Sequence, residues 1–175
     1  PADPGPARTV VVEGNTVADA PQVGIEVLAR DSSTQFGDVS VPVVVNNVVN
    51  RAGAARSSSP FNNVAMRVYG DALDGSLLRG NDGAGSRINA FMLAGSLTTD
   101  TTFPLGDIPV GLSRTTSLTG LEVAQGATLT IAPGTVIKAE DSGNAIATYD
   151  GSLKVRGSLR ALGTAAEPIV FTSIR

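Results

Sequence analysis

Histidine and cysteine are both absent from the 175 residues of this chain. Their absence excludes disulfide bonds, Cys/His zinc sites, iron–sulfur clusters and any nucleophile that is activated by a histidine. No apolar run is long enough to span a membrane, so no membrane span is expected. The net charge of −3 comes from 13 basic and 16 acidic residues, so the chain has no basic footprint for nucleic acid.

The residues that usually cover surface helices are also scarce. Glu and Lys together number only 7, whereas Val, Ile and Thr number 44 and Gly and Pro number 30. β-Branched residues favour strands, and Gly and Pro favour the turns between them. Because no stretch has apolar residues at helical spacing between caps, the composition predicts an all-β protein.

Short apolar segments recur in the C-terminal half of the chain at a nearly constant interval, slightly more than twenty positions. The aligned pairs are Leu129 with Leu153, Ile137 with Leu159, and Ile146 with Ile169. Short strands at a fixed period are typical of a parallel β-solenoid, in which each coil buries its inner face only by stacking on its neighbours. This pattern predicts a parallel β-helix with about three short strands per coil, and the preference for right-handed crossovers predicts a right-handed one.

Alternation with period 2 predicts which side chains face inward. Lys154 and Arg160 should face solvent, and the apolar residues beside them should face the core. The predicted core residues are Leu129, Ile131, Leu153, Val155, Leu159, Ile169 and Phe171.

The N-terminal half repeats more loosely, around asparagines. Asn15, Asn47 and Asn81 recur at two similar intervals, each slightly more than thirty positions, and the first two follow valine-rich segments. We predict that they stack at one corner of successive coils, bond to each other and tolerate the left-handed conformation. The alternative is that asparagine is simply a common turn residue.

These patterns divide the chain into four parts. We assign 1–9 to a linker, 10–95 to irregular coils with Asn corners, 96–120 to a seam or one irregular coil, and 121–175 to regular coils that continue beyond this chain. The strand expected near Pro168 to Ile174 has an apolar inner face and an open edge. We therefore expect this chain to be a segment of a longer polypeptide, or to pair with another copy end to end.

Two segments carry a family resemblance. The run from Leu121 to Lys138, which includes Ala127-Thr128-Leu129-Thr130-Ile131-Ala132-Pro133-Gly134, resembles right-handed parallel β-helix repeat proteins, the pectate-lyase-like superfamily of bacterial surface and secreted proteins. Gly163 to Ser173 resembles the same repeats, and the likeness covers residues 96–173 well. The resemblance implies the fold and an extracellular or cell-surface location. It does not imply one function, because such proteins include polysaccharide lyases, hydrolases, adhesins and stalks.

Catalytic members of that superfamily use clustered acidic residues that bind Ca²⁺, with a basic residue nearby. The nearest pattern is Asp71 and Asp74, with Arg67 and Arg79 close in sequence, but Asp-x-x-Asp-Gly is ordinary turn chemistry. Glu140 and Asp141 are adjacent in an expected loop. We therefore predict no catalytic, cofactor-binding or metal-ligating residue, no cofactor, and a chain that is not an enzyme.

Three weaker candidates remain. Asn81 to Gly85 could form a Ca²⁺ loop, but its spacing fits a tight solvated turn better. Thr98 to Thr102 is threonine-rich, yet it is one run rather than a ladder at coil spacing. Tyr149 is the aromatic residue least suited to a core and could touch a ligand.

The function predicted from these observations is structural. We expect a non-catalytic scaffold, stalk, adhesin or filament segment of an extracellular bacterial β-helix protein, whose partners are further coils or another copy, and cell-surface polysaccharide as a further candidate. The alternative is a carbohydrate-binding or polysaccharide-processing β-helix whose active residues lie outside this chain.

Overall fold

The structure is a computed structural model, and it describes residues 10–29, 41–54, 63–113, 120–140 and 151–174. Within these ranges the chain is all-β: it contains short and long strands, one 3₁₀ turn and no α-helix. Every strand pairing among these residues is parallel. The prediction of an all-β chain is confirmed, and parallel pairing is what stacked coils require.

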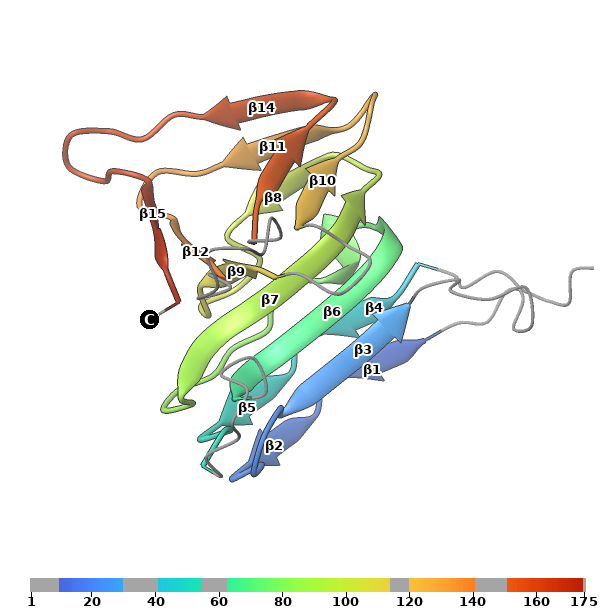
Figure 1. The fold of residues 1–175 in the computed structure, drawn as a ribbon, viewed down its shortest axis with the longest axis vertical. Helices are drawn as coiled ribbons and strands as arrows, with labels where there is room; N and C mark the ends of the chain where they lie inside the picture. The colour runs from blue at the N-terminus through green and yellow to red at the C-terminus, as the bar shows by residue number, and fades with distance from the viewer. Residues whose placement is uncertain (1–9, 30–40, 55–62, 114–119, 141–150, 175) are drawn as a thin grey trace, which may run out of the picture.

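The strands fall into stacked layers that are joined by parallel pairing (Figure 1). Layer 1 holds β1 (Val11–Glu13), β2 (Thr16–Ala18) and β3 (Ile25–Ala29). Layer 2 holds β4 (Val43–Val45), β5 (Val48–Asn50) and β6 (Val64–Leu73). β1 pairs with β4, β2 with β5 and β3 with β6.

Layer 3 holds the 3₁₀ turn η2 (Gly75–Leu77), a single bridge from Asp82 to Val48, and β7 (Ile88–Leu97). Layer 4 holds β8 (Thr101–Phe103), β9 (Val110–Leu112) and β10 (Leu121–Val123). β9 pairs with the middle of β7, at Phe91 to Leu93, and β10 pairs with its end, at Gly95 to Leu97. The long third strand of layers 2 and 3 is thus divided in two in layer 4.

Layer 5 holds β11 (Thr128–Ile131), β12 (Val136–Ala139) and β13 (Leu153–Val155). Layer 6 holds β14 (Ser158–Ala161) and β15 (Val170–Ser173). β11 pairs with β8 and β14, β12 pairs with β9 and β15, and β13 pairs with β10. No described strand of layer 6 lies over β13.

This register corrects the repeat period that the sequence suggested. Leu129 pairs with Leu159 rather than with Leu153, and Leu153 pairs with Leu121. From β8 onward, in-register partners are between 27 positions apart (Val110 with Ile137) and 34 positions apart (Val136 with Val170), which is longer than the period that the sequence suggested. The shorter period aligned strands from different sides of the stack, within layer 5 for Leu129 and Leu153 and between layers 5 and 6 for Ile137 and Leu159, because all the short segments share the same apolar–polar alternation. The Ile146 segment of that alignment lies outside the described residues.

The segment 96–120, expected as a seam or an irregular coil, contributes strands to the same sheets. Its described part contains β8 and β9, which pair with layer 5, and β9 also pairs with β7. The change in sequence pattern at this segment coincides with the point where the long strand is divided.

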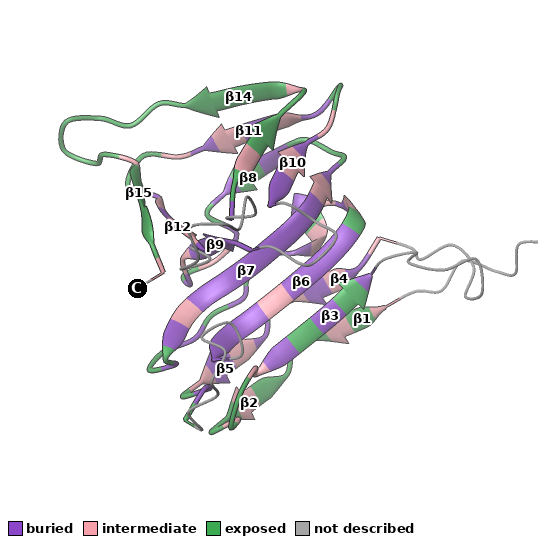
Figure 2. Cartoon of the chain, viewed as in Figure 1, coloured by how far each residue is buried: buried purple, intermediate pink, exposed green. Residues whose placement is uncertain are grey.

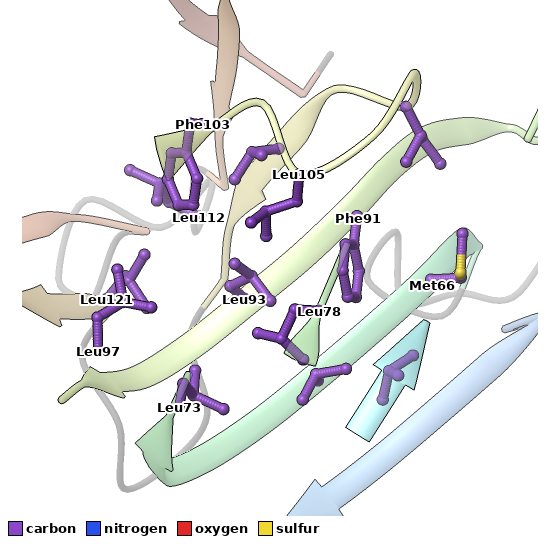
Figure 3. Close-up of a cluster of buried hydrophobic side chains, with 14 of the residues drawn as sticks. Met66, Leu73, Leu78, Phe91, Leu93, Leu97, Phe103, Leu105, Leu112 and Leu121 are labelled. Atoms are coloured by element: carbon purple, nitrogen blue, oxygen red, sulfur yellow. The ribbon is translucent and has the colours of Figure 1, made fainter. Parts of the chain in front are cut away.

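The core lies between the sides of the stacked layers (Figure 3). Alternate residues of the strands point into it, and the pattern on β3 is buried–exposed–buried–exposed–buried. The largest fully buried side chains are Leu, Ile, Phe and Met, among them Phe91, Phe103, Met66 and Leu121. Apolar burial of this kind is the main favourable term that holds the layers together.

Of the seven predicted core residues, two are buried, two are half-buried and three are exposed. Leu129 and Ile131 are buried, but Leu153 and Ile169 are only half-buried. The remaining three, Val155, Leu159 and Phe171, are exposed. The reason is position in the stack: these side chains share a register with buried residues, but no described layer covers them. Figure 2 shows the change from buried β6 and β7 to exposed β14 and β15.

The asparagine ladder is confirmed. Asn15 Nδ2 donates to Asn47 Oδ1, and Asn47 Nδ2 donates to Asn81 Oδ1, both at 3.0 Å. Asn47 and Asn81 are fully buried, and their amides also donate to backbone carbonyls of their own and the preceding layer. Buried polar groups require hydrogen-bond partners, and here the side-chain amides donate to the backbone carbonyl oxygens at the corner.

The left-handed conformation is not at the ladder residues, contrary to the prediction. It lies one residue earlier, at Gly14, Asn46 and Gly80, whose φ values are 68°, 56° and 71°. At each corner, two adjacent residues therefore have different roles. A residue that tolerates positive φ turns the chain, and the following asparagine bonds to the layers on either side.

Candidate functional site

The acidic pair Asp71 and Asp74 does not form a binding cluster. Asp74 caps η2, accepting hydrogen bonds from Ser76 N at 2.9 Å and Ser76 Oγ at 2.7 Å. Partial burial raises the pKa of Asp74, but hydrogen bonds from Ser76 and Thr99 together bring that pKa below its usual value. The side chain thus performs the turn chemistry expected from its sequence.

The two arginines near this pair also have structural partners. Arg67 forms an ion pair with Glu26 of the adjacent strand β3 at 2.7 Å, and its guanidinium lies 5.7 Å from the ring centre of Tyr69. Arg79 donates to Ser76 O at 2.9 Å, which closes the turn that follows η2.

The segment from Asn81 to Gly85 forms a corner. Asn81 belongs to the buried ladder, and Asp82 is exposed, with its Oδ1 accepting from Gly83 N. Asp82 is the one acidic residue of the segment. Among the residues that the structure describes, no group of three or more acidic side chains is placed to hold a metal ion.

Glu140 directly follows β12, outside the strand as expected, but its side chain is buried. It is 4% exposed, and its Oε2 accepts from Ser113 Oγ at 2.9 Å. Ser113 Oγ lies 3.1 Å from the hydroxyl of Tyr69, so three side chains from β6 and from the ends of β9 and β12 form a buried polar chain. Ser113 and Glu140 stand where the long strand is divided in layers 4 and 5. Asp141 and Tyr149 lie outside the described residues.

The threonine run is where the structure adds most to the sequence. Thr101 faces inward and is buried, whereas Thr102 faces outward. Thr102 pairs with Thr130 of β11, and Thr130 pairs with Arg160 of β14. The run is therefore part of a row that crosses three strands, and the expectation of a single isolated run is wrong. Sequence reasoning missed this row because its members lie far apart along the chain.

A groove of about 360 Å³ lies on this outer face. It is lined by Asp100, Thr101, Thr102, Thr128, Thr130 and Arg160. Asp100 Oδ1 accepts from Thr128 N at 2.7 Å, which positions the carboxylate at one end of the groove. Regular pairing of β8, β11 and β14 positions the other side chains, because outward residues of in-register strands stand side by side.

The groove offers unused hydrogen-bonding groups. Within the described residues, Arg160 forms no ion pair or hydrogen bond, and the hydroxyls of Thr102, Thr128 and Thr130 have no partner. Its hydroxyls, one guanidinium and one carboxylate can bind a polar ligand. The described residues of the groove include no nucleophile with a base beside it.

Comparison with known proteins adds no family to this description. No family model, no curated protein and no solved structure matches the chain. The described residues also contain no helix that is long and apolar enough to cross a membrane. The function must therefore be inferred from the geometry alone.

Proposed function

We propose that the chain is a right-handed parallel β-helix whose layers are successive coils. Parallel pairing throughout the described residues, in-register contacts between layers and the asparagine ladder support this architecture. Right-handedness follows the strong general preference of parallel crossover connections. Three sides per coil correspond to the three strands of layers 1, 2, 4 and 5.

The function that fits this architecture best is structural. We propose a non-catalytic segment of an extracellular or cell-surface protein that serves as a scaffold, stalk, adhesin or filament. One observation carries the proposal: the last layer continues the inward pattern of the core with nothing described over it. Leu159 is 42% exposed beside Leu129, which is 0% exposed, and Phe171 is 57% exposed beside Ile137 at 1%.

An uncovered layer of this kind is an association surface. Its apolar side chains favour burial, and the free edges of β13, β14 and β15 offer unpaired backbone groups. A further coil, or another copy stacked end to end, would satisfy both requirements at once. The location outside the cell rests on the resemblance of residues 96–173 to surface and secreted β-helix proteins.

Sedimentation velocity over a range of protein concentrations tests the stacking. The wild-type chain should associate as its concentration rises, because each molecule exposes the apolar end. The double variant Leu159→Lys/Phe171→Lys should remain near the monomer mass of 17.7 kDa. Gln125→Lys is the control, since Gln125 is exposed in the turn between β10 and β11, away from both ends of the stack, and should not affect association.

Two results would contradict the proposal. One is a wild-type chain that remains monomeric at the highest attainable concentration. The other is association of the double variant that equals that of the wild type. Circular dichroism of all three proteins shows whether the substitutions leave the strands intact.

A second candidate function is carbohydrate binding, and the polar groove on β8, β11 and β14 favours it. Hydroxyl and charged side chains that line an outer groove are suited to hydroxyl-rich ligands. This role is compatible with a scaffold, because the groove lies on the outer face and the stacking surface faces along the axis of the layers.

A further inference from the structure

The groove on β8, β11 and β14 is polarised from one end to the other. Asp100 precedes β8 in layer 4, and Arg160 lies on β14 in layer 6. Two strand spacings separate these layers, which is about 10 Å in a β-sheet. The carboxylate and the guanidinium therefore stand at opposite ends, with Thr128 and Thr130 of β11 between them.

The two charged groups differ in how much of their bonding capacity is used. Asp100 already accepts from Thr128 N, so one carboxylate oxygen has a structural task. Arg160 has no partner among the described residues, and its side chain presents a fork of N–H donors. The guanidinium of Arg160 is therefore available to donate two parallel hydrogen bonds to an anion with planar oxygens, such as a carboxylate.

The rest of the groove favours a neutral, hydroxylated partner. Thr102, Thr128 and Thr130 present hydroxyls that both donate and accept, and the free oxygen of Asp100 accepts from sugar hydroxyls. A second carboxylate placed near Asp100 would be repelled. The ligand that matches both ends has one acidic group at one end and neutral hydroxylated rings along the rest.

We propose that this groove binds an oligosaccharide that ends in a single acidic sugar, an inference that rests on the carbohydrate-binding role proposed above. The terminal carboxylate bonds to the guanidinium of Arg160, and the neutral sugars lie along the threonines toward Asp100. The groove does not depend on stacking of chains, because its side chains point outward from the same strands whose Leu129 and Leu159 point inward. The outcome of the sedimentation experiment is therefore independent of this proposal.

The experiment is a titration followed by ¹⁵N–¹H NMR. The probes are 3′-sialyllactose, which has one terminal carboxylate, and lactose, which is the same glycan without the acidic sugar. We expect saturable shifts at the amides of Thr128, Thr130 and Arg160 with sialyllactose, at a dissociation constant of about 1 mM or below. Lactose should bind several-fold more weakly.

Variants assign the binding to the groove. Arg160→Gln should weaken sialyllactose binding by about fivefold or more, since a hydrogen bond to a charged group is lost, and should leave lactose unaffected. Thr130→Val preserves the shape of the side chain but removes the hydroxyl, and should weaken both ligands. Arg87→Gln is the matched control, because Arg87 is exposed before β7, away from the groove, and carries the same charge.

Three results would overturn the proposal. The first is no saturable shift at about 10 mM sialyllactose, a concentration well above the expected dissociation constant. The second is equal binding of sialyllactose and lactose, which would remove the role of the carboxylate. The third is binding that neither Arg160→Gln nor Thr130→Val weakens. Two independent variants are used so that poor folding of one leaves the other informative.

Discussion

Phe171 lies beside Ile137 on the neighbouring strand, with its side chain in the same register, yet Ile137 is 1% exposed and Phe171 is 57% exposed. The two residues have the same role in the sequence pattern and opposite environments in the structure. The difference arises because a further layer lies over Ile137 and none of the described layers lies over Phe171. Ile137 lies between β9 and β15, whereas Phe171 has β12 on one side and no described strand on the other.

The same relationship predicts unequal effects of two equivalent truncations. Leu129 and Leu159 are paired in register, and they are 0% and 42% exposed. Leu129→Ala should lower the free energy of unfolding by about 2–5 kcal/mol, because it opens a cavity in the core. Leu159→Ala should cost about 1 kcal/mol or less at protein concentrations where the chain is monomeric. Urea denaturation measures both, and equal losses would contradict the uncovered last layer.

Asn47 should be the most sensitive residue of the asparagine ladder. Its amide donates to Val12 O and Asn81 Oδ1, and its Oδ1 accepts from Asn15. Asn47→Ala leaves buried backbone groups unsatisfied and should cost about 2–4 kcal/mol.

Asn15→Ala is the control for this prediction, because Asn15 is exposed at the first layer and water can replace its bonds. That variant should cost about 1 kcal/mol or less. A loss at Asn47 as small as that at Asn15 would show that the ladder contributes little to stability.

Gly95 and Gly126 provide a matched pair of backbone tests. Both have positive φ, at 122° and 89°. A methyl group at Gly95 would overlap the carbonyl oxygen of Gly70 on β6, whereas one at Gly126 would meet nothing within 4 Å.

Gly95→Ala should therefore destabilise the chain by about 3 kcal/mol or more, because strain and overlap add. Gly126→Ala should cost only the strain of about 1–2 kcal/mol. Thermal unfolding of the two variants compares them directly, and equal shifts in melting temperature would mean that β6 and β7 separate to relieve the overlap.

Asp19 and Arg51 should give a measurable titration signal. The guanidinium of Arg51 donates two hydrogen bonds of 2.7 Å to the carboxylate of Asp19, which lowers the pKa of Asp19. Since the folded pKa is below the unfolded one, the stabilisation is present above the unfolded pKa and is lost as the pH falls through the folded pKa.

Carbon-13 NMR of the Asp19 carboxyl should show this lowered pKa in the wild type. In Arg51→Gln the pKa should rise toward that of an ordinary aspartate, because the charged donor is gone. The contribution to stability should be small, since both side chains are well exposed. An unchanged pKa in the variant would assign the shift to another cause.

Much of the fold could be predicted from particular residues. The Val43-Val44-Val45 segment and the alternation around Lys154 correctly indicate strands, and the spacing of Asn15, Asn47 and Asn81 predicts the ladder. These features could be predicted because they depend on a few neighbouring residues, or because the same residue type recurs at the same corner of successive layers. The candidate site could not be predicted in the same way, because Asp100, Thr130 and Arg160 meet only after three layers have stacked.

The amino-acid sequence by itself determined that this chain is all-β, which residues of each strand face inward, and which asparagines stack at one corner. Each of these follows from backbone geometry over a few residues, since side chains alternate along a strand and only some residues tolerate a tight corner. Only the tertiary structure decided which strands pair, which inward faces are covered and which polar side chains share a groove. Those outcomes depend on the number of residues between paired strands such as β11 and β14. Because all the strands have the same apolar–polar alternation, the sequence of one strand does not indicate which other strand it pairs with.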